Sequence, residues 1–122
     1  MRKVVALIPA KEKSERVKNK NLKKVCKRPL LWWTIDSAKK SRFINEIYVS
    51  SDSLKILNYS KKNKAKTLKR PKNISNKFAT KRDVIFHALN YFKKKNKFFD
   101  YLIYLQPTSP LRTNYHINYA LN

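Results

Sequence analysis

The chain has 122 residues, 42% of them apolar, which fits one compact domain with a modest core rather than two domains. Its apolar runs, such as residues 4–8, are far shorter than the roughly 20 residues that span a bilayer. No small-residue cleavage site follows a hydrophobic segment near the start, so we expect a soluble, cytosolic protein. The single cysteine, Cys26, excludes an internal disulfide and has no Cys or His neighbour at zinc-ligand spacing.

The net charge of +23 has two interpretations. Clustered cations favour a nucleic-acid partner, because they displace counterions from phosphate backbones. The charge comes from 23 lysines and only 7 arginines, in a chain without glycine, which is the bias expected from AT-rich codons. We favour the codon interpretation, since few arginines are available for bidentate phosphate contacts and no recognised nucleic-acid motif is present.

Short β-branched runs alternate with segments of helical period, and this alternation predicts βαβ units on a parallel sheet. Strands are expected at residues 4–9, 47–50, within 65–68 and at 101–105. Helices are expected at residues 29–40, after Ser53, after Thr80 and at 114–122, with the two hydroxyl residues as N-caps. The inner faces of the first and third helices are predicted to carry Leu30, Trp33, Ile35 and Ala38, and Val84, Ala88, Leu89 and Phe92.

Ligands of open parallel sheets bind outside the carboxyl ends of the strands, so the loops that follow the strands are the candidate site. The first loop, residues 10–21, has a local excess of three positive charges, which suits a triphosphate. The last loop, residues 106–112, reads Gln-Pro-Thr-Ser-Pro-Leu-Arg. Its prolines fix the backbone and leave one amide and two hydroxyls to bind a nucleotide.

These loops resemble those of the acylneuraminate cytidylyltransferases, the CMP-sialic acid synthetases. The similarity is carried in order by Ile8-Pro9-Ala10, Ser14, Lys20-Asn21, Pro29-Leu30, Trp33-Thr34-Ile35, Val49-Ser50, Asp52-Ser53, Arg70-Pro71, His87-Ala88-Leu89 and the nine residues from Leu105 to Thr113. The resemblance implies a Rossmann-like, three-layer α/β nucleotidyltransferase fold with a mainly parallel sheet. It covers about the first half of a family member, so we expect one nucleotide-binding domain, incomplete at its carboxyl end.

The resemblance also implies roles for individual residues. Lys20 and Arg16 would be catalytic, stabilising the departing pyrophosphate while a sugar hydroxyl attacks the α-phosphorus of CTP. Asp52 is either a helix cap or a site residue. The residues that would bind the nucleotide are Lys11, Ser14, Lys20, Asn21, Arg70, Gln106, Thr108 and Ser109.

The implied substrates are CTP and an acidic sugar of the sialic type, with Mg²⁺ as the family's metal and a possible homodimer in full-length members. The carboxylates that would hold Mg²⁺ belong to the half of the family that this chain does not match, so no metal ligand is assigned here. The first loop also lacks the family's glycines, and Glu15 and Lys77 stand where the family usually has a lysine and an aspartate. An alternative is therefore a truncated or vestigial module that binds a nucleotide without turnover.

Overall fold

The computed structural model describes residues 2–11, 24–25, 27–71 and 80–107. They form a four-stranded parallel sheet, a two-stranded antiparallel ribbon and three helices. The elements are β1 (Val4–Pro9), β2 (Lys24–Val25), β3 (Arg28–Pro29), α1 (Leu30–Lys40), β4 (Glu46–Ser51), α2 (Leu54–Lys62), β5 (Lys66–Lys69), α3 (Lys81–Lys94) and β6 (Tyr101–Tyr104). No helix in these ranges is long and apolar enough to cross a membrane.

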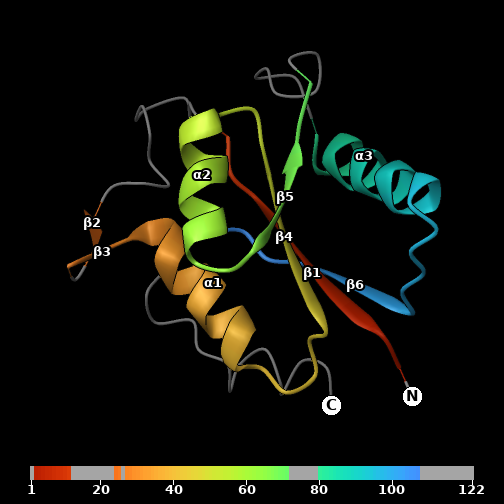
Figure 1. Ribbon diagram of the computed structural model, residues 1–122, viewed down its shortest axis with the longest axis horizontal. Helices are drawn as coiled ribbons and strands as arrows, with labels where there is room; N and C mark the ends of the chain where they lie inside the picture. The colour runs from red at the N-terminus through yellow and green to blue at the C-terminus, as the bar shows by residue number, and fades with distance from the viewer. Residues whose placement is uncertain (1, 12–23, 26, 72–79, 108–122) are drawn as a thin grey trace.

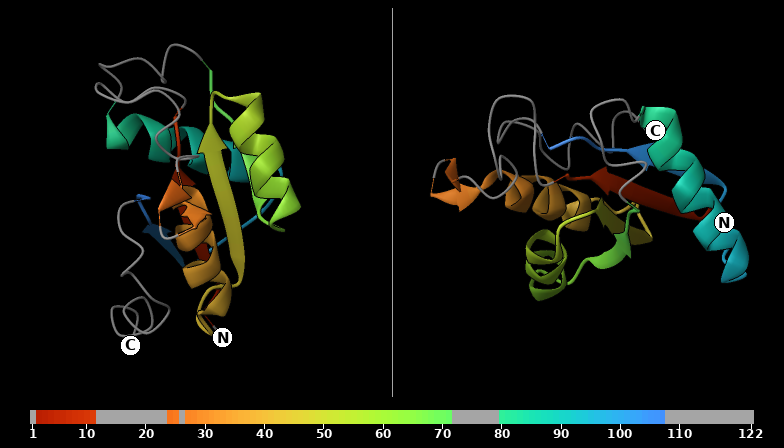
Figure 2. Two further views of the ribbon diagram at one scale, coloured as in Figure 1. Left: turned by 90° about the vertical axis from the view of Figure 1, so that its left-hand side faces the viewer. Right: turned by 90° about the horizontal axis from the view of Figure 1, so that it is seen from above.

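The main sheet has the strand order β5-β4-β1-β6, with every pair parallel. β1 lies at its centre, where Ile8 is in register with Val49 of β4 and Leu7 with Tyr104 of β6. Helices α1 and α2 cover one face of the sheet and α3 covers the other (Figures 1 and 2). The molecule thus has the predicted three-layer α/β architecture.

β1 divides the core into two clusters, because successive side chains of a strand point to opposite faces. Ala6 and Ile8 pack with α1 and α2, around Leu31 and Ile35. Val5 and Leu7 pack on the other face, with the α3 residues Val84, Ala88 and Phe92. A strand buried on both faces reads as a continuous apolar run, which is why β1 is visible in the sequence.

The helix starts confirm the predicted caps. The Ser53 hydroxyl accepts a hydrogen bond from the Ile56 amide at 3.3 Å and caps α2. Thr80 and Asp83 form a reciprocal capping box at the start of α3, with bonds of 3.2 and 2.9 Å. These local signals needed no tertiary context, so the sequence was sufficient to find them.

Three details differ from the sequence prediction. Leu89, predicted on the inner face of α3, is 44% exposed, because the inner stripe runs through Val84, Ala88 and Phe92 and leaves it to one side. Leu31, which was not predicted, is fully buried in α1, whereas Trp33 is only half buried. The β2–β3 ribbon was not predicted. The helix expected at residues 114–122 lies outside the described residues.

Glu46 links separate parts of the fold. Its carboxylate accepts hydrogen bonds from the amines of Lys66 on β5 and, at 2.9 Å, of Lys97 in the segment before β6. Burial raises the pKa of Glu46, but the hydrogen bonds and charges of the two lysines outweigh it and hold the pKa below its ordinary value. One carboxylate therefore links β4 to β5 and to the segment between α3 and β6.

Helices α2 and α3 end in Schellman motifs that contain no glycine. After α2, the Ala65 amide donates to the Ser60 carbonyl and the Lys64 amide to the Lys61 carbonyl, both at 3.0 Å. Lys64 adopts φ 64° there, and Asn96 adopts φ 54° in the same position after α3. A β-carbon makes this left-handed conformation costly, and for lysine more than for asparagine.

We predict that Lys64→Gly stabilises the protein by about 0.5–1 kcal/mol, because glycine removes the left-handed penalty at a small entropic cost. Urea denaturation followed by tryptophan fluorescence would measure the change. The same substitution two residues earlier, Lys62→Gly, lies within α2 and should destabilise by about 0.5–1 kcal/mol. Equal effects at both positions would show that the left-handed conformation of Lys64 carries no penalty.

Candidate functional site

The candidate site lies at the edge of the sheet where all four parallel strands end. From β1 the chain crosses to β4 over the face covered by α1 and α2, whereas it reaches β6, on the other side of β1, through α3 on the opposite face. Such a change of direction opens a crevice at the carboxyl ends of the strands. Lys11 follows β1, Asp52 follows β4, Arg70 follows β5 and Gln106 lies two residues beyond β6.

Arg70 is buried and firmly anchored at this edge. Its side chain is buried, with the residue only 5% exposed, and Nη2 donates to the Ser50 carbonyl at 3.2 Å. The Arg70 amide donates to the Ser51 carbonyl at 2.8 Å, and the Ser50 carbonyl also accepts from the Ala10 amide at 2.9 Å. The guanidinium therefore sits where the ends of β1, β4 and β5 meet.

Arginine is rarely fully buried in proteins, so a buried arginine with a shifted pKa is a candidate site residue. Burial lowers the pKa of Arg70 below its ordinary value, although the nearby Asp52 and Tyr104 oppose the shift. An arginine side chain keeps its charge in proteins, so the cation persists in this dry setting. It provides a fixed positive charge with little reorganisation cost for an anionic or carbonyl-bearing ligand.

Three buried polar atoms in the described residues have no hydrogen-bond partner: Ser50 Oγ, Arg70 Nε and His87 Nδ1. The first two belong to residues joined by the Nη2 bond, and His87 on α3 lies near enough to feel the charge of Arg70. Native interiors rarely leave such atoms unsatisfied. They mark the surroundings of Arg70 as a polar part of the interior.

Tyr104 and Gln106 form the β6 side of the site. Burial raises the pKa of the Tyr104 phenol, and the charge of Arg70 and a hydrogen bond with the Gln106 side chain pull it back in part. Gln106 is exposed beside the buried Pro107, so its amide is held at the rim by the bond to Tyr104. Tyr104 thus connects the two predicted site residues that flank it in space, Arg70 and Gln106.

Of the residues predicted to bind the nucleotide, the structure describes Lys11, Arg70 and Gln106, all at the carboxyl edge. Lys11 is half buried directly after β1. The predicted catalytic residues Arg16 and Lys20, and the predicted contacts Ser14, Asn21, Thr108 and Ser109, lie outside the described residues. Sequence reasoning did not single out Ser50 and Tyr104, although Ser50 ends one predicted strand and Tyr104 stands one residue before the end of another, which was the available signal.

Asp52 follows β4 at the carboxyl edge of the sheet. Within the described ranges no group of three His, Cys, Asp or Glu side chains is placed to hold an ion. Ser53 caps α2, so Asp52 is not the helix cap, and its charge instead acts on Arg70.

His87 should make stability depend on pH. Burial, then the charges of Arg70 and Lys94, lower its pKa below the ordinary 6.5, so the folded state binds its proton less readily than the unfolded state. The contribution of His87 to the free energy of unfolding is fully present above pH 6.5. It is lost as the pH falls from there through the lower pKa of the folded state. We predict that His87→Leu removes this component from urea denaturation curves recorded between pH 7.5 and about 5.

The second histidine of the chain, His116, supplies the matched control. His116→Leu should keep the pH dependence that His87→Leu loses. If the two variants behaved the other way round, the burial of His87 Nδ1 would not be the cause.

Comparisons with known proteins identify the family and the fold. The family model described as cytidylyltransferase matches residues 5–122. The chain is 33% identical to N-acylneuraminate cytidylyltransferase of Escherichia coli, over 94% of this chain and 26% of that protein. It is 31% identical to pseudaminic acid cytidylyltransferase of Campylobacter jejuni, over 89% of this chain and 47% of that protein. It is 33% identical to CMP-N,N'-diacetyllegionaminic acid synthase of Legionella pneumophila, over 98% of this chain and 52% of that protein.

Two solved structures share the fold. A CMP:2-keto-3-deoxy-manno-octonic acid synthetase complexed with CTP superposes with a TM-score of 0.78 at 20% identity, covering 98% of this chain and 46% of that one. A cytidylyltransferase from Leptospira borgpetersenii has a TM-score of 0.74 at 21% identity, covering 99% and 48%. The chain spans about a quarter to a half of the length of these relatives. With a match that runs over nearly its whole length, the chain belongs to the cytidylyltransferase family.

Proposed function

We propose that this chain forms the nucleotide-binding half of an enzyme that transfers CMP from CTP to an acidic sugar of the sialic type, with release of pyrophosphate. The observation that carries the proposal is the buried Arg70, with an unpartnered Nε, at the carboxyl edge of the sheet beside Tyr104 and Gln106. Family membership gives this arrangement its ligand, a cytidine nucleotide.

The nucleotide would lie across the ends of β1 and β6. Gln106 offers an amide that both donates and accepts, and Arg70 donates only, which suits the carbonyl and ring nitrogen of cytosine. Asn21, Thr108 and Ser109 are proposed to complete the contacts with the base and ribose. Discrimination would come from these polar groups, because a wrong base would leave them unpaired in a partly dry site.

The phosphates would face the loop that begins at Lys11. In the reaction, an oxygen of the sugar forms a new bond to the α-phosphorus, and the bond from that phosphorus to the pyrophosphate oxygen breaks. Charge accumulates on the leaving pyrophosphate, so fixed cations there lower the barrier. We assign this role to Arg16 and Lys20, and we assign Lys11 and Ser14 to binding the phosphates.

The acceptor is proposed from the names of the relatives. N-acylneuraminate, pseudaminic acid and diacetyllegionaminic acid are all acidic sugars, and the named enzymes couple them to CMP or are cytidylyltransferases for them. This chain spans only part of those proteins. We therefore propose the class of the acceptor, an acidic sugar, and not one particular sugar.

A second candidate is nucleotide binding without turnover by the 122-residue chain. Two observations favour it. The chain covers only part of its relatives, and residues 2–11, 24–25, 27–71 and 80–107 contain no cluster of three His, Cys, Asp or Glu side chains placed to hold a metal ion. Both candidates require CTP to bind at Arg70, and they differ in whether pyrophosphate is released.

We predict that CTP binds the chain and that Arg70→Lys weakens it about tenfold or more, since a lysine cannot reproduce the fork that holds Ser50 and faces the ligand. Isothermal titration calorimetry would measure the affinity. Arg42→Lys, at an exposed arginine that packs over the Phe43 ring, is the matched control and should leave it unchanged. Equal affinity in both variants would remove Arg70 from the site.

Turnover is tested by incubating the chain with CTP, Mg²⁺ and a panel of acidic sugars while pyrophosphate is measured. Sugar-dependent release that Lys20→Ala lowers by about 100-fold or more would support the transferase. Binding of CTP with no release for any sugar would instead support the second candidate for this chain.

A further inference from the structure

The first turn of α3 lies at the same edge of the sheet as the candidate site. β5 and β6 are strands of one parallel sheet, so the helix between them begins at the carboxyl edge, where β5 ends, and runs back toward the start of β6. Lys81 is the first residue of this helix, and it is exposed. Its place in the fold therefore puts a cation beside the site that nothing in the sequence singled out.

Lys81 is held over the ring of Tyr104. Its Nζ lies 5.3 Å from the centroid of that ring, so the contact joins the start of α3 to the end of β6. Among the residues that the structure describes, Lys81 has no ion-pair partner. An ammonium over an aromatic face is attracted by the ring and keeps N–H donors for another acceptor. The ring thus positions this cation without using up its donors.

Tyr104 has a second cation as a neighbour. The charge of Arg70 acts on the phenol, and this guanidinium is buried with an unpartnered Nε. The carboxylate whose charge acts on Arg70 is that of Asp52. Two cations and one carboxylate leave a net positive charge around Tyr104, which favours an anionic group of a ligand at this point of the edge.

The dipole of α3 does not explain a lysine at its start. The dipole favours cations in the last turn of a helix, where α3 has Lys93 and Lys94, and disfavours them in the first. The acidic residue of the first turn, Asp83, is engaged with Thr80 in the capping box. An anion bound beside Lys81 would be stabilised by the ammonium and by the helix start together.

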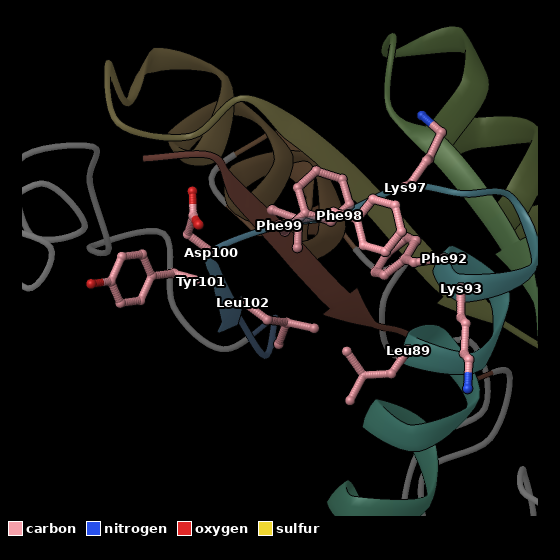
Figure 3. A pocket seen from close by; sticks show the side chains of 10 residues that line it. Leu89, Phe92, Lys93, Lys97, Phe98, Phe99, Asp100, Tyr101 and Leu102 are labelled. Atoms are coloured by element: carbon pink, nitrogen blue, oxygen red, sulfur yellow. The ribbon is translucent and has the colours of Figure 1, made fainter. Parts of the chain in front are cut away.

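The groove at the other end of β6 is a poorer place for an anion. It has a volume of about 340 Å³ and lies between α3 and the start of β6. Leu89 and Leu102 point toward one another across it, and the amines of its two lysines, Lys93 and Lys97, point in opposite directions (Figure 3). Lys97 already donates to Glu46 at 2.9 Å. The carboxyl end of β6, with Lys81, is therefore the better candidate.

We infer that Lys81 is a further ligand-binding residue of the site, and that its ammonium, held on the Tyr104 ring, binds a negatively charged oxygen of the ligand. Such an oxygen belongs to a phosphate of the nucleotide or to the carboxylate of an acidic sugar, and both accept from an ammonium in the same way. The inference rests on the proposed function for the place of the ligand. The two can fail separately, because Lys81 and Arg70 are changed in separate variants.

The first test compares two neighbouring substitutions that each remove one positive charge, Lys81→Gln and Arg82→Gln. Arg82 is exposed, and its guanidinium packs over the Phe86 ring and not over Tyr104. Calorimetry measures the binding of CTP, and of N-acetylneuraminate with CTP present. Lys81→Gln should weaken one of these ligands by about fivefold or more, because a charge-assisted hydrogen bond is lost. At about 0.15 M salt, where distant charges are screened, Arg82→Gln should change neither by more than about twofold.

Equal affinities of the two variants for both ligands would overturn the inference. If Arg70→Lys still weakened CTP in that case, the proposed function would stand without Lys81. If the wild-type chain bound pyrophosphate through Lys81 but bound CTP no more tightly than pyrophosphate, the inference would hold and recognition of the cytidine would fail. No measurable binding of any of the three ligands to the wild-type chain would overturn both.

Ligand fragments identify the oxygen that Lys81 binds. If it belongs to a phosphate, Lys81→Gln should weaken CTP and pyrophosphate and leave cytidine unchanged. If it belongs to the sugar carboxylate, the variant should weaken N-acetylneuraminate and leave CTP unchanged. Weaker binding of cytidine to the same extent as CTP would contradict both sources, because cytidine carries no charge.

The role of the ring is tested in Tyr104→Phe and Tyr104→Leu. Both remove the hydroxyl that bonds Gln106, but only phenylalanine keeps the aromatic face. Lys81→Gln should cost as much affinity in the Tyr104→Phe background as in the wild type, and less than about twofold in the Tyr104→Leu background, because coupled residues are not additive. A full effect of Lys81→Gln in the leucine background would show that the ring does not hold the ammonium, and would overturn that part of the inference.

Discussion

The fold depends on β1 being paired on both edges and covered on both faces. Its backbone bonds to β4 and β6, and its side chains divide into the two core clusters. A strand with no exposed side cannot carry charge, so the lysine-rich composition stops at Lys3 and resumes at Lys11. The first charged position after the strand, Lys11, therefore lies at the carboxyl edge of the sheet.

The same constraint explains why Arg70 serves both the fold and the site. Parallel strands place their last carbonyls at one edge, and those carbonyls lack partners once the strands end. Arg70 supplies donors to the Ser50 and Ser51 carbonyls from its side chain and its backbone. The guanidinium is bonded to the end of β4 and is buried, so the charge at this edge is held in a fixed position.

Sequence reasoning recovered what local signals determine. The apolar run of β1 and the caps Ser53 and Thr80 were predicted where the structure has them, because burial on two faces and a hydroxyl before a helix are visible locally. Leu89 was misplaced because helical spacing gives the width of an apolar stripe but not its centre, which depends on where the sheet lies. Arg70 was assigned through resemblance, since nothing in the sequence around it reveals that a charged residue is buried.

The positions of the lysines bear on how the charge of +23 should be interpreted. Each of the three helices has two lysines in its last turn, where the helix dipole favours cations. The helices run back from the carboxyl edge of the parallel sheet, so these last turns lie toward its amino edge, where Lys39 Nζ donates to the Asn63 carbonyl just beyond α2 at 3.1 Å. The dipole accounts for these positions without a nucleic-acid partner. Lysine instead occupies places where many residues would be tolerated, even the left-handed position of Lys64, as expected if composition drifted while the fold was kept.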